Sequence, residues 1–217
     1  MRLYILCEGQ TEDRFVKEVL YPHLLHSDIY AMPIICATKK NVDGKYKGGV
    51  SKYSKIRKEL EILCKSDPTS FVTTMFDYYK LPKDTPGKNA SGDIYKIAQE
   101  IESSINADLG MPKNLLVNLV LHEFEGLLFS DVTVFLGKAK ADNKAVMELE
   151  RVKDSFPSPE HINDSDDTVP SKRIRRILPE YSKILDGIVI AKNIGLDKIA
   201  EECPHFKAWL EAIKTLA

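Results

Sequence analysis

Blocks of apolar residues alternate with polar segments up to about Phe129 in a way that predicts strands and helices in turn. Short apolar runs rich in β-compatible residues indicate buried strands, whereas apolar residues three or four positions apart indicate amphipathic helices. Repetition of strand and helix is typical of a parallel sheet with helices on both faces. Strands are expected over 2–7, 29–37 (with Pro33 indicating an edge or a bend), 71–76 and 115–121, and helices over 11–24 (with Thr11 as N-cap), 53–63 and 94–105.

The pattern changes after about Phe129, where apolar stripes at helical spacing predict helices and no convincing strand remains. A loop rich in Pro, Ser and Asp over 156–170 interrupts them, and Phe206, Trp209 and Leu210 are expected to anchor the last helix. The sequence thus predicts an α/β domain over 1–129 and a helical extension over 130–217 packed on it. The 217 residues suffice for a sizeable core.

Charge and composition exclude some classes of protein. With 31 basic and 32 acidic side chains the formal net charge is -1, so nucleic-acid binding would depend on local patches or metal ions. No stretch approaches the roughly 20 apolar residues that span a bilayer, and an acidic residue ends the first apolar run too early for a signal peptide. We expect a cytoplasmic protein without membrane contact. The four cysteines form no C-x-x-C pair, which argues against zinc and for buried apolar roles.

Carboxylates follow three of the four predicted strands. Glu8, Asp77 and Glu123 each come directly after an apolar run, and Glu125 follows two residues after Glu123. The carboxyl ends of parallel strands form the ligand crevice, so these acids should converge there with Glu12, and a cation would offset their repulsion. Several hard oxygen ligands favour Mg²⁺ or Mn²⁺. The alternative for each is that an acid solvates a turn or, for Glu12, favours a helix dipole.

Motifs across most of the chain resemble one bacterial domain-of-unknown-function family, described as Toprim-like and often encoded near ATPase genes. The motifs are C-E-G-Q-T-E (7–12), M-F-D-Y-Y (75–79), H-E-F-E-G-L-L-F (122–129), P-S-K-R (170–173), I-G-L (194–196) and C-P-H-F (203–206) with W-L (209–210). The E-G-x-x-E opening is shared with the overcoming-lysogenisation-defect nucleases.

The resemblance implies the Toprim fold, with a metal-binding glutamate after the first strand and a D-x-D pair after a later one. Glu8 matches the glutamate and Asp77 the first aspartate, but Tyr79 stands where the second aspartate is expected. A phenol is a poor Mg²⁺ ligand, so Glu123 or Glu125 would have to replace it. This departure puts full two-metal catalysis in doubt.

Three further features have both a functional and a structural interpretation. Lys172 and Arg173 could hold phosphate or could lie on a solvated helix face paired with nearby acids. His122 could be a general base or cap a helix. The lysines between residues 39 and 55, with Tyr46 and Tyr53 among them, could form a nucleic-acid groove or a flexible surface.

We therefore predict a Mg²⁺- or Mn²⁺-dependent nuclease or related phosphodiester-processing enzyme, acting on DNA or RNA, with a role in phage defence beside a partner ATPase. Glu8, Glu12, Asp77, Glu123 and Glu125 are the candidate metal ligands, and Glu8, Asp77, His122, Lys172 and Arg173 the candidate catalytic residues. The alternative is a non-catalytic effector or regulatory subunit that uses the acidic cleft for binding. No complete phosphate-binding loop is present, so nucleotide hydrolysis by this chain is not expected. The sequence does not predict the oligomeric state.

Overall fold

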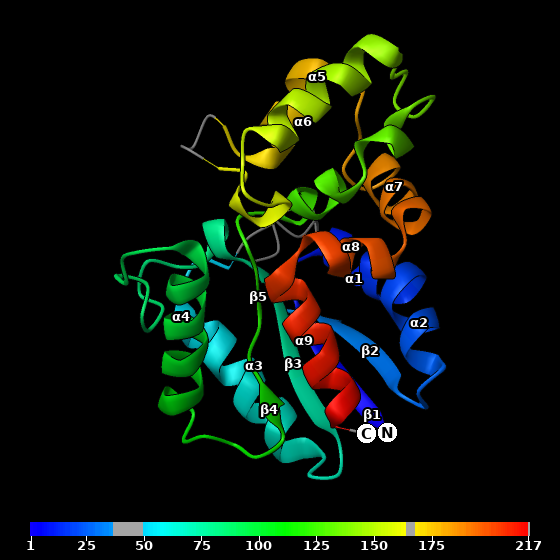
Figure 1. Cartoon of the computed structure of the whole chain (residues 1–217). Coiled ribbons are helices and arrows are strands. Elements are labelled where there is room, and N and C mark those ends of the chain that lie inside the picture. The colour runs from blue at the N-terminus through cyan, green and yellow to red at the C-terminus, as the bar shows by residue number, and fades with distance from the viewer. Residues whose placement is uncertain (37–49, 164–167, 217) are drawn as a thin grey trace, which may run out of the picture.

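A parallel β-sheet forms the centre of the computed structural model, which describes residues 1–36, 50–163 and 168–216 (Figure 1). The sheet order is β2-β1-β3-β4, with β5 also pairing with β3, and every pair is parallel. This confirms the predicted α/β class with a core of four to five parallel strands. The strands are β1 (Arg2–Cys7), β2 (Tyr30–Ile35), β3 (Phe71–Asp77), β4 (Leu115–Leu116) and β5 (Leu119–Val120).

Helices cover both faces of this sheet because the strands are apolar on both sides. Leu3 and Ile5 of β1 belong to one buried cluster and Leu6 to another, as alternation along a strand requires. Thr11 was expected to cap the first helix; Gly9 stands at the N-cap instead, and no side chain bonds to that end. The N-terminal half contains α1 (Gln10–Phe15), the π-helical η1 (Val16–Leu20), α2 (Tyr21–Leu25), α3 (Tyr53–Ser66), the 3₁₀ turn η2 (Tyr78–Lys80) and α4 (Ile94–Asp108).

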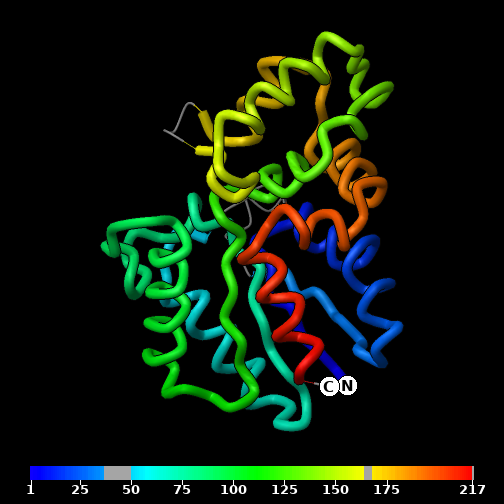
Figure 2. The backbone as a smooth tube through the Cα atoms, viewed as in Figure 1, coloured from blue at the N-terminus to red at the C-terminus, as the bar shows by residue number. Residues whose placement is uncertain are grey.

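The C-terminal part is helical, as predicted. Figure 2 follows the chain from β5 through a group of helices beyond the carboxyl edge of the sheet and back to the sheet in the last helix. Its elements are η3 (Phe124–Ser130), η4 (Val132–Phe135), α5 (Asn143–Asp154), η5 (Pro159–His161), α6 (Pro170–Ile177), α7 (Asp186–Ile194), α8 (Leu196–Glu202) and α9 (Pro204–Thr215).

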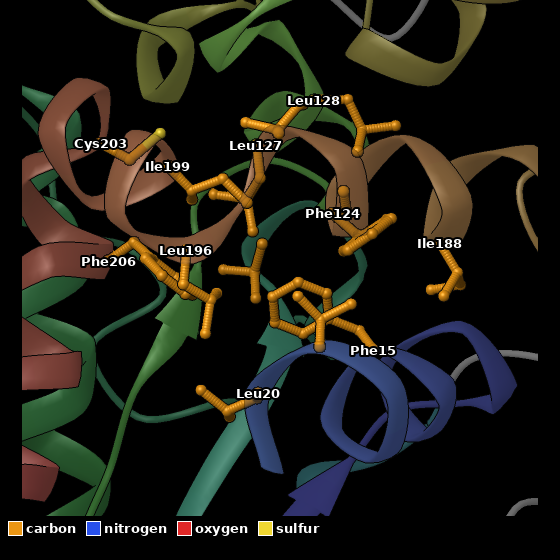
Figure 3. Close-up of a cluster of buried hydrophobic side chains, with 14 of the residues drawn as sticks. Phe15, Leu20, Phe124, Leu127, Leu128, Ile188, Leu196, Ile199, Cys203 and Phe206 are labelled. Atoms are coloured by element: carbon orange, nitrogen blue, oxygen red, sulfur yellow. The ribbon is translucent and has the colours of Figure 1, made fainter. Parts of the chain in front are cut away.

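The larger buried cluster joins side chains from both parts of the chain (Figure 3). Phe15 of α1 packs edge-on against Phe124 of η3, with ring centroids 5.3 Å apart, and against Phe206 of α9, at 6.2 Å. Fully burying one such side chain contributes roughly 1.5–3 kcal/mol. The contacts hold α1 and η3 together at the carboxyl edge of the sheet, which positions the site described below.

The predicted strand over 115–121 is wrong in its continuity, since the structure divides it into β4 and β5. The cause lies in β3. The Thr73 hydroxyl donates to the carbonyl oxygen of Leu116 at 2.6 Å, and the Thr74 hydroxyl bonds both the carbonyl oxygen and the amide of Asn118, at 2.6 and 2.8 Å. Threonine side chains thus occupy backbone groups that a continuous ladder would pair, and apolar periodicity does not reveal this.

A distant carboxylate caps α9. Glu160 is buried, and its two oxygens accept the amides of His205 at 2.9 Å and Phe206 at 3.0 Å. These are among the four amides that a helix leaves unpaired at its N-terminus. The C-P-H-F segment therefore begins a helix whose cap comes from residue 160, a pairing without a local sequence signal.

We expect Glu160→Ala to destabilise the protein by about 1–2 kcal/mol, because loss of an N-cap side chain costs that much and leaves two amides unpaired. Urea unfolding of the native protein and the variant measures the difference. Glu150→Ala, on α5, is the matched control and should change the free energy of unfolding by less than about 0.5 kcal/mol. Equal effects of the two substitutions would show that Glu160 does not cap α9.

Part of the lysine-rich region can be assessed. Residues 39–49, with Tyr46, lie outside the described residues. Tyr53 is buried at the start of α3, where its hydroxyl donates to Asp108 at 2.9 Å and its amide donates to Asp84 at 3.1 Å. Tyr53 is thus a packing residue and does not supply an exposed ring for stacking on a base. No helix in the described part of the chain is long and apolar enough to cross a membrane.

Candidate functional site: an acid cluster at the carboxyl edge of the sheet

The register of the sheet brings the strand-end acids to one edge. Cys7 pairs with Met75 and Asp77 pairs with Val120, so β1, β3 and β5 end side by side. The five acids that follow or end these strands are all buried. We call them the acid cluster: Glu8 after β1, Glu12 in the first turn of α1, Asp77 at the end of β3, and Glu123 and Glu125 at the start of η3.

Two lysine ammonium groups lie among these carboxylates. The Nζ atom of Lys80, in η2, is 2.9 Å from Asp77 Oδ2, 3.9 Å from Glu8 Oε1 and 4.0 Å from Glu123 Oε1. The Nζ atom of Lys183 is 3.0 Å from Glu125 Oε2, 3.8 Å from Asp77 Oδ2 and 3.9 Å from Glu12 Oε1. Asp77 Oδ2 is therefore shared by two positive charges, and each of the other four acids faces one.

Burial and mutual repulsion disfavour the charged carboxylates. Burial, followed by the charge of Asp77, raises the pKa of Glu8 to about 8 and that of Glu12 to about 7. Burial also raises the pKa of Glu125. For Lys183, burial acts to lower the pKa, but Asp77, Glu125 and Glu12 together raise it above its ordinary range. The lysines therefore stay charged and offset part of a concentrated negative charge.

Two backbone amides fix the orientation of the acids. The amide of Phe124 donates to Asp77 Oδ1 at 3.1 Å, and the amide of Ser171 donates to Glu123 Oε2 at 3.1 Å. The second bond attaches the first turn of α6 to the acid cluster. Glu125 is different, because neither of its oxygens has a hydrogen-bond partner among the described residues, although Lys183 lies close.

The donor set suits a hard divalent cation. All five side chains offer carboxylate oxygens, the ligand type preferred by Mg²⁺ and Mn²⁺, and both oxygens of Glu125 are fully buried. In residues 1–36, 50–163 and 168–216 no three or more His, Cys, Asp or Glu side chains are arranged to hold a metal ion as they lie. The lysine ammonium groups lie between the acids instead. A cation would have to take the place of at least one of them.

Two of the other predicted site residues, His122 and Arg173, bond to residues outside the acid cluster. His122 is buried with a left-handed backbone (φ 61°); its Nδ1 is 3.1 Å from Asn163 Nδ2, and its ring meets that of Tyr78. Burial lowers the pKa of His122 to about 4, so the ring is neutral near pH 7. Arg173 donates to the carbonyl oxygen of Thr168 at 2.6 Å. Lys172 and Arg173 lie in the first turn of α6, next to the amide that binds Glu123.

Sequence reasoning missed Lys80 and Lys183. Lys80 follows Asp77 by three positions, and a 3₁₀ turn directly after a strand would have placed its ammonium beside that carboxylate. Lys183 lies in the connection between α6 and α7, where no pattern distinguishes it from a surface lysine. Its position depends on packing, including a 2.6 Å hydrogen bond from Arg14 to the carbonyl oxygen of Ile184.

The raised pKa values predict how the stability of the metal-free protein depends on pH. Glu8 and Glu12 titrate near 4.5 when unfolded but at about 8 and about 7 when folded. Between these values the folded state binds more protons, so in EDTA the free energy of unfolding should fall as the pH rises from about 4.5 to about 8. Glu8→Gln cannot titrate and should make this fall shallower, whereas Glu150→Gln should leave it unchanged. Urea unfolding at pH 5 and pH 8.5 measures how far the free energy of unfolding falls in each protein. An equal fall in the native protein and in Glu8→Gln would show that the pKa of Glu8 is not raised in the folded state.

The fold and the site together define the class of protein: a parallel α/β core with buried acids at the carboxyl edge of its sheet. The chain belongs to the family described as domain of unknown function DUF4276, whose model matches residues 7–214. This confirms the prediction of a domain-of-unknown-function family. Among solved structures, the C-terminal region of the Xanthomonas campestris pv. campestris OLD protein is similar at 14% identity and a TM-score of 0.37, with 97% of this chain and 96% of that chain covered. No curated protein matches the chain.

Proposed function

We propose that the chain is a divalent-metal-dependent enzyme that hydrolyses phosphodiester bonds in DNA or RNA. The observation that carries the proposal is the convergence of five buried carboxylates on two positive charges, with Asp77 shared between them. Concentrating so many acids without a cation is unfavourable, and their raised pKa values express this cost. The positions of the two ammonium groups mark where the cluster accepts positive charge.

Glu8, Asp77 and Glu123 would hold a Mg²⁺ or Mn²⁺ ion on the Lys80 side, and Glu12 and Glu125 would complete the Lys183 side. Bound metal would activate water and offset negative charge on the phosphate. Glu12 and Glu125, on the Lys183 side, would supply the carboxylate ligand that Tyr79 cannot. Lys172 and Arg173, at the start of α6, would hold the phosphate backbone, since that turn already bonds to Glu123. His122, which precedes Glu123 in the sequence and is neutral near pH 7, would orient the water or accept a proton from it.

One observation favours a second candidate. The two lysines already compensate the acid cluster without metal, and Tyr79 stands at a position where a carboxylate was expected. A binding subunit that recognises a cationic group through the acid cluster would show the same features. We extend either candidate to a cytoplasmic role in phage defence with a partner ATPase, because the sequence motifs resemble a family often encoded near ATPase genes.

A cleavage assay distinguishes the two candidates. Native protein and Glu8→Gln are incubated with single- and double-stranded DNA and RNA, in Mn²⁺, in Mg²⁺ and in EDTA. We expect native protein to cleave at least one substrate in Mn²⁺ but not in EDTA, and Glu8→Gln to be inactive under all conditions. Cleavage that persists in EDTA would contradict metal dependence. Inactivity of native protein on all four substrates would favour the binding subunit.

A further inference from the structure

A second cavity lies away from the acid cluster, between α4 and α9 at the β4–β5 edge of the sheet. Its volume is about 420 Å³, within the range of small-molecule sites, and none of the five acids lines it. Figure 1 shows the β4–β5 segment running between these two helices. The lining residues used below are Tyr95, Glu102, Val117, His205, Ala208 and Trp209.

The backbone at this edge leaves one residue unpaired. The carbonyl of Asn114 faces β3, where it accepts the amide of Val72 at 2.8 Å, and the carbonyl oxygen of Asn118 accepts the Thr74 hydroxyl. Alternation along the strand therefore turns the odd-numbered residues away from β3. Of these, the Leu115 amide donates to the carbonyl oxygen of Pro112 at 3.2 Å and the Leu119 amide to Glu102 Oε1 at 2.9 Å. Val117, between them, has no hydrogen-bond partner among the described residues.

This arrangement argues against an added strand and for a compact ligand. A strand that extends the sheet pairs with several alternate residues of the edge. Here the amides of Leu115 and Leu119 are already bonded, so among these three outward-facing residues only Val117 offers both a free N–H and a free C=O. In extended backbone these two groups point to the same side of the strand. The N–H can donate to an acceptor on a ligand while the C=O accepts from a donor next to it. A heteroaromatic base presents such an edge.

The walls of the cavity suit a planar base. The indole of Trp209 is held in place because its Nε1 donates to the Thr73 hydroxyl at 2.9 Å, and Tyr95 lies on the opposite helix. His205 Nε2 and Glu102 Oε1, 3.0 Å apart, also line the cavity and add polar groups to its wall. Proteins that bind single bases combine apolar or aromatic walls with hydrogen bonds to the base edge. We propose that this cavity is a second site, distinct from the acid cluster, that binds a nucleobase through the backbone of Val117.

The single tryptophan of the chain provides the readout, because Trp209 lines the cavity. Its fluorescence, excited at wavelengths that bases do not absorb, is followed in full-length protein in EDTA during titration with adenosine, adenosine monophosphate and a single-stranded oligodeoxyadenylate. Purine riboside, which lacks the exocyclic amine, tests the second hydrogen bond. Ala208→Leu fills the cavity from an exposed position on α9, and Ala107→Leu makes the same change on α4 outside the cavity.

We expect a saturable fluorescence change with adenosine or with the oligonucleotide. Whichever of these ligands binds more tightly shows whether the base comes from a free nucleotide or from a strand. Ala208→Leu should weaken binding more than about tenfold, and Ala107→Leu should not. Purine riboside should bind about 3- to 10-fold more weakly than adenosine, because it lacks one hydrogen bond. If Ala208→Leu melts early, Ala212→Leu at the same cavity replaces it. Absence of a saturable change with all ligands, or equal binding to the cavity-filling and control variants, overturns the proposal. Because no metal is present, this result is independent of cleavage.

Discussion

Asp77→Asn should abolish metal-dependent cleavage while the protein stays folded. Asp77 Oδ2 is the oxygen that both lysines approach, so this carboxylate would contribute to every cation position in the cluster. Even substitutions that only disturb the orientation of metal ligands cost 10- to 100-fold, and removal of the shared ligand should lower the rate of cleavage by more than about 100-fold. Initial rates in Mn²⁺ measure the loss.

Asp13→Asn is the matched control, because Asp13 lies on α1 next to Glu12 but pairs with Lys17 outside the cluster. It should retain the native rate. Asparagine at residue 77 still offers an oxygen to the amide of Phe124, so circular dichroism of Asp77→Asn should match the native protein. Its melting temperature in EDTA should fall, because Lys80 and Lys183 lose their common partner. Native activity in Asp77→Asn would exclude the acid cluster as the reaction centre.

Lys183→Met should be the most destabilising single substitution in the metal-free site. It leaves Glu125, fully buried, without the cation that lies 3.0 Å away, and leaves Glu12 and Asp77 less compensated. Breaking a buried ion pair from one side typically costs 3–5 kcal/mol, and because Lys183 is partly exposed we expect about 3 kcal/mol at pH 8. Urea unfolding in EDTA gives this value. Lys192→Met, exposed on α7, should have little effect.

The loss should shrink in acid and in metal. Burial raises the pKa of Glu12 and of Glu125, so in acid these two side chains are neutral in the folded protein and the missing ammonium matters less. Excess Mn²⁺ should restore more stability to Lys183→Met than to the native protein, because the ion no longer has to displace Lys183. If Mn²⁺ stabilises the two proteins equally, Lys183 and the metal do not share a position.

The acids of the site could be predicted because parallel topology alone determines their position. Glu8, Asp77 and Glu123 each follow an apolar run, and parallel strands end at one edge, so no knowledge of side-chain packing is needed. The same reasoning failed at 115–121, where the hydroxyls of Thr73 and Thr74 interrupt the ladder. Periodicity records which face a residue occupies, not which hydrogen bonds a neighbouring strand takes.

The positions of Lys183 in the site and of Glu160 at α9 could not be predicted from the chain, for a related reason. Lys183 reaches the cluster from a connection between two short helices, and Glu160 reaches the start of α9 from a 3₁₀ turn. Both placements follow from how the C-terminal helices pack over the sheet edge. The division of the chain at about residue 129 stays a prediction, and the buried cluster draws side chains such as Phe15 and Phe206 from both sides of that position.

Direct titration of Mn²⁺ into metal-free protein tests the central claim most closely. Isothermal titration calorimetry on the native protein, Glu8→Gln, Asp77→Asn and the control Asp13→Asn measures affinity and stoichiometry without any assumption about substrate. The account predicts binding by the native protein and by Asp13→Asn, with affinity at least about tenfold weaker in Glu8→Gln and Asp77→Asn, since each loses a carboxylate ligand. Binding of equal strength in all four proteins, or none in the native protein, would contradict a metal site at the acid cluster.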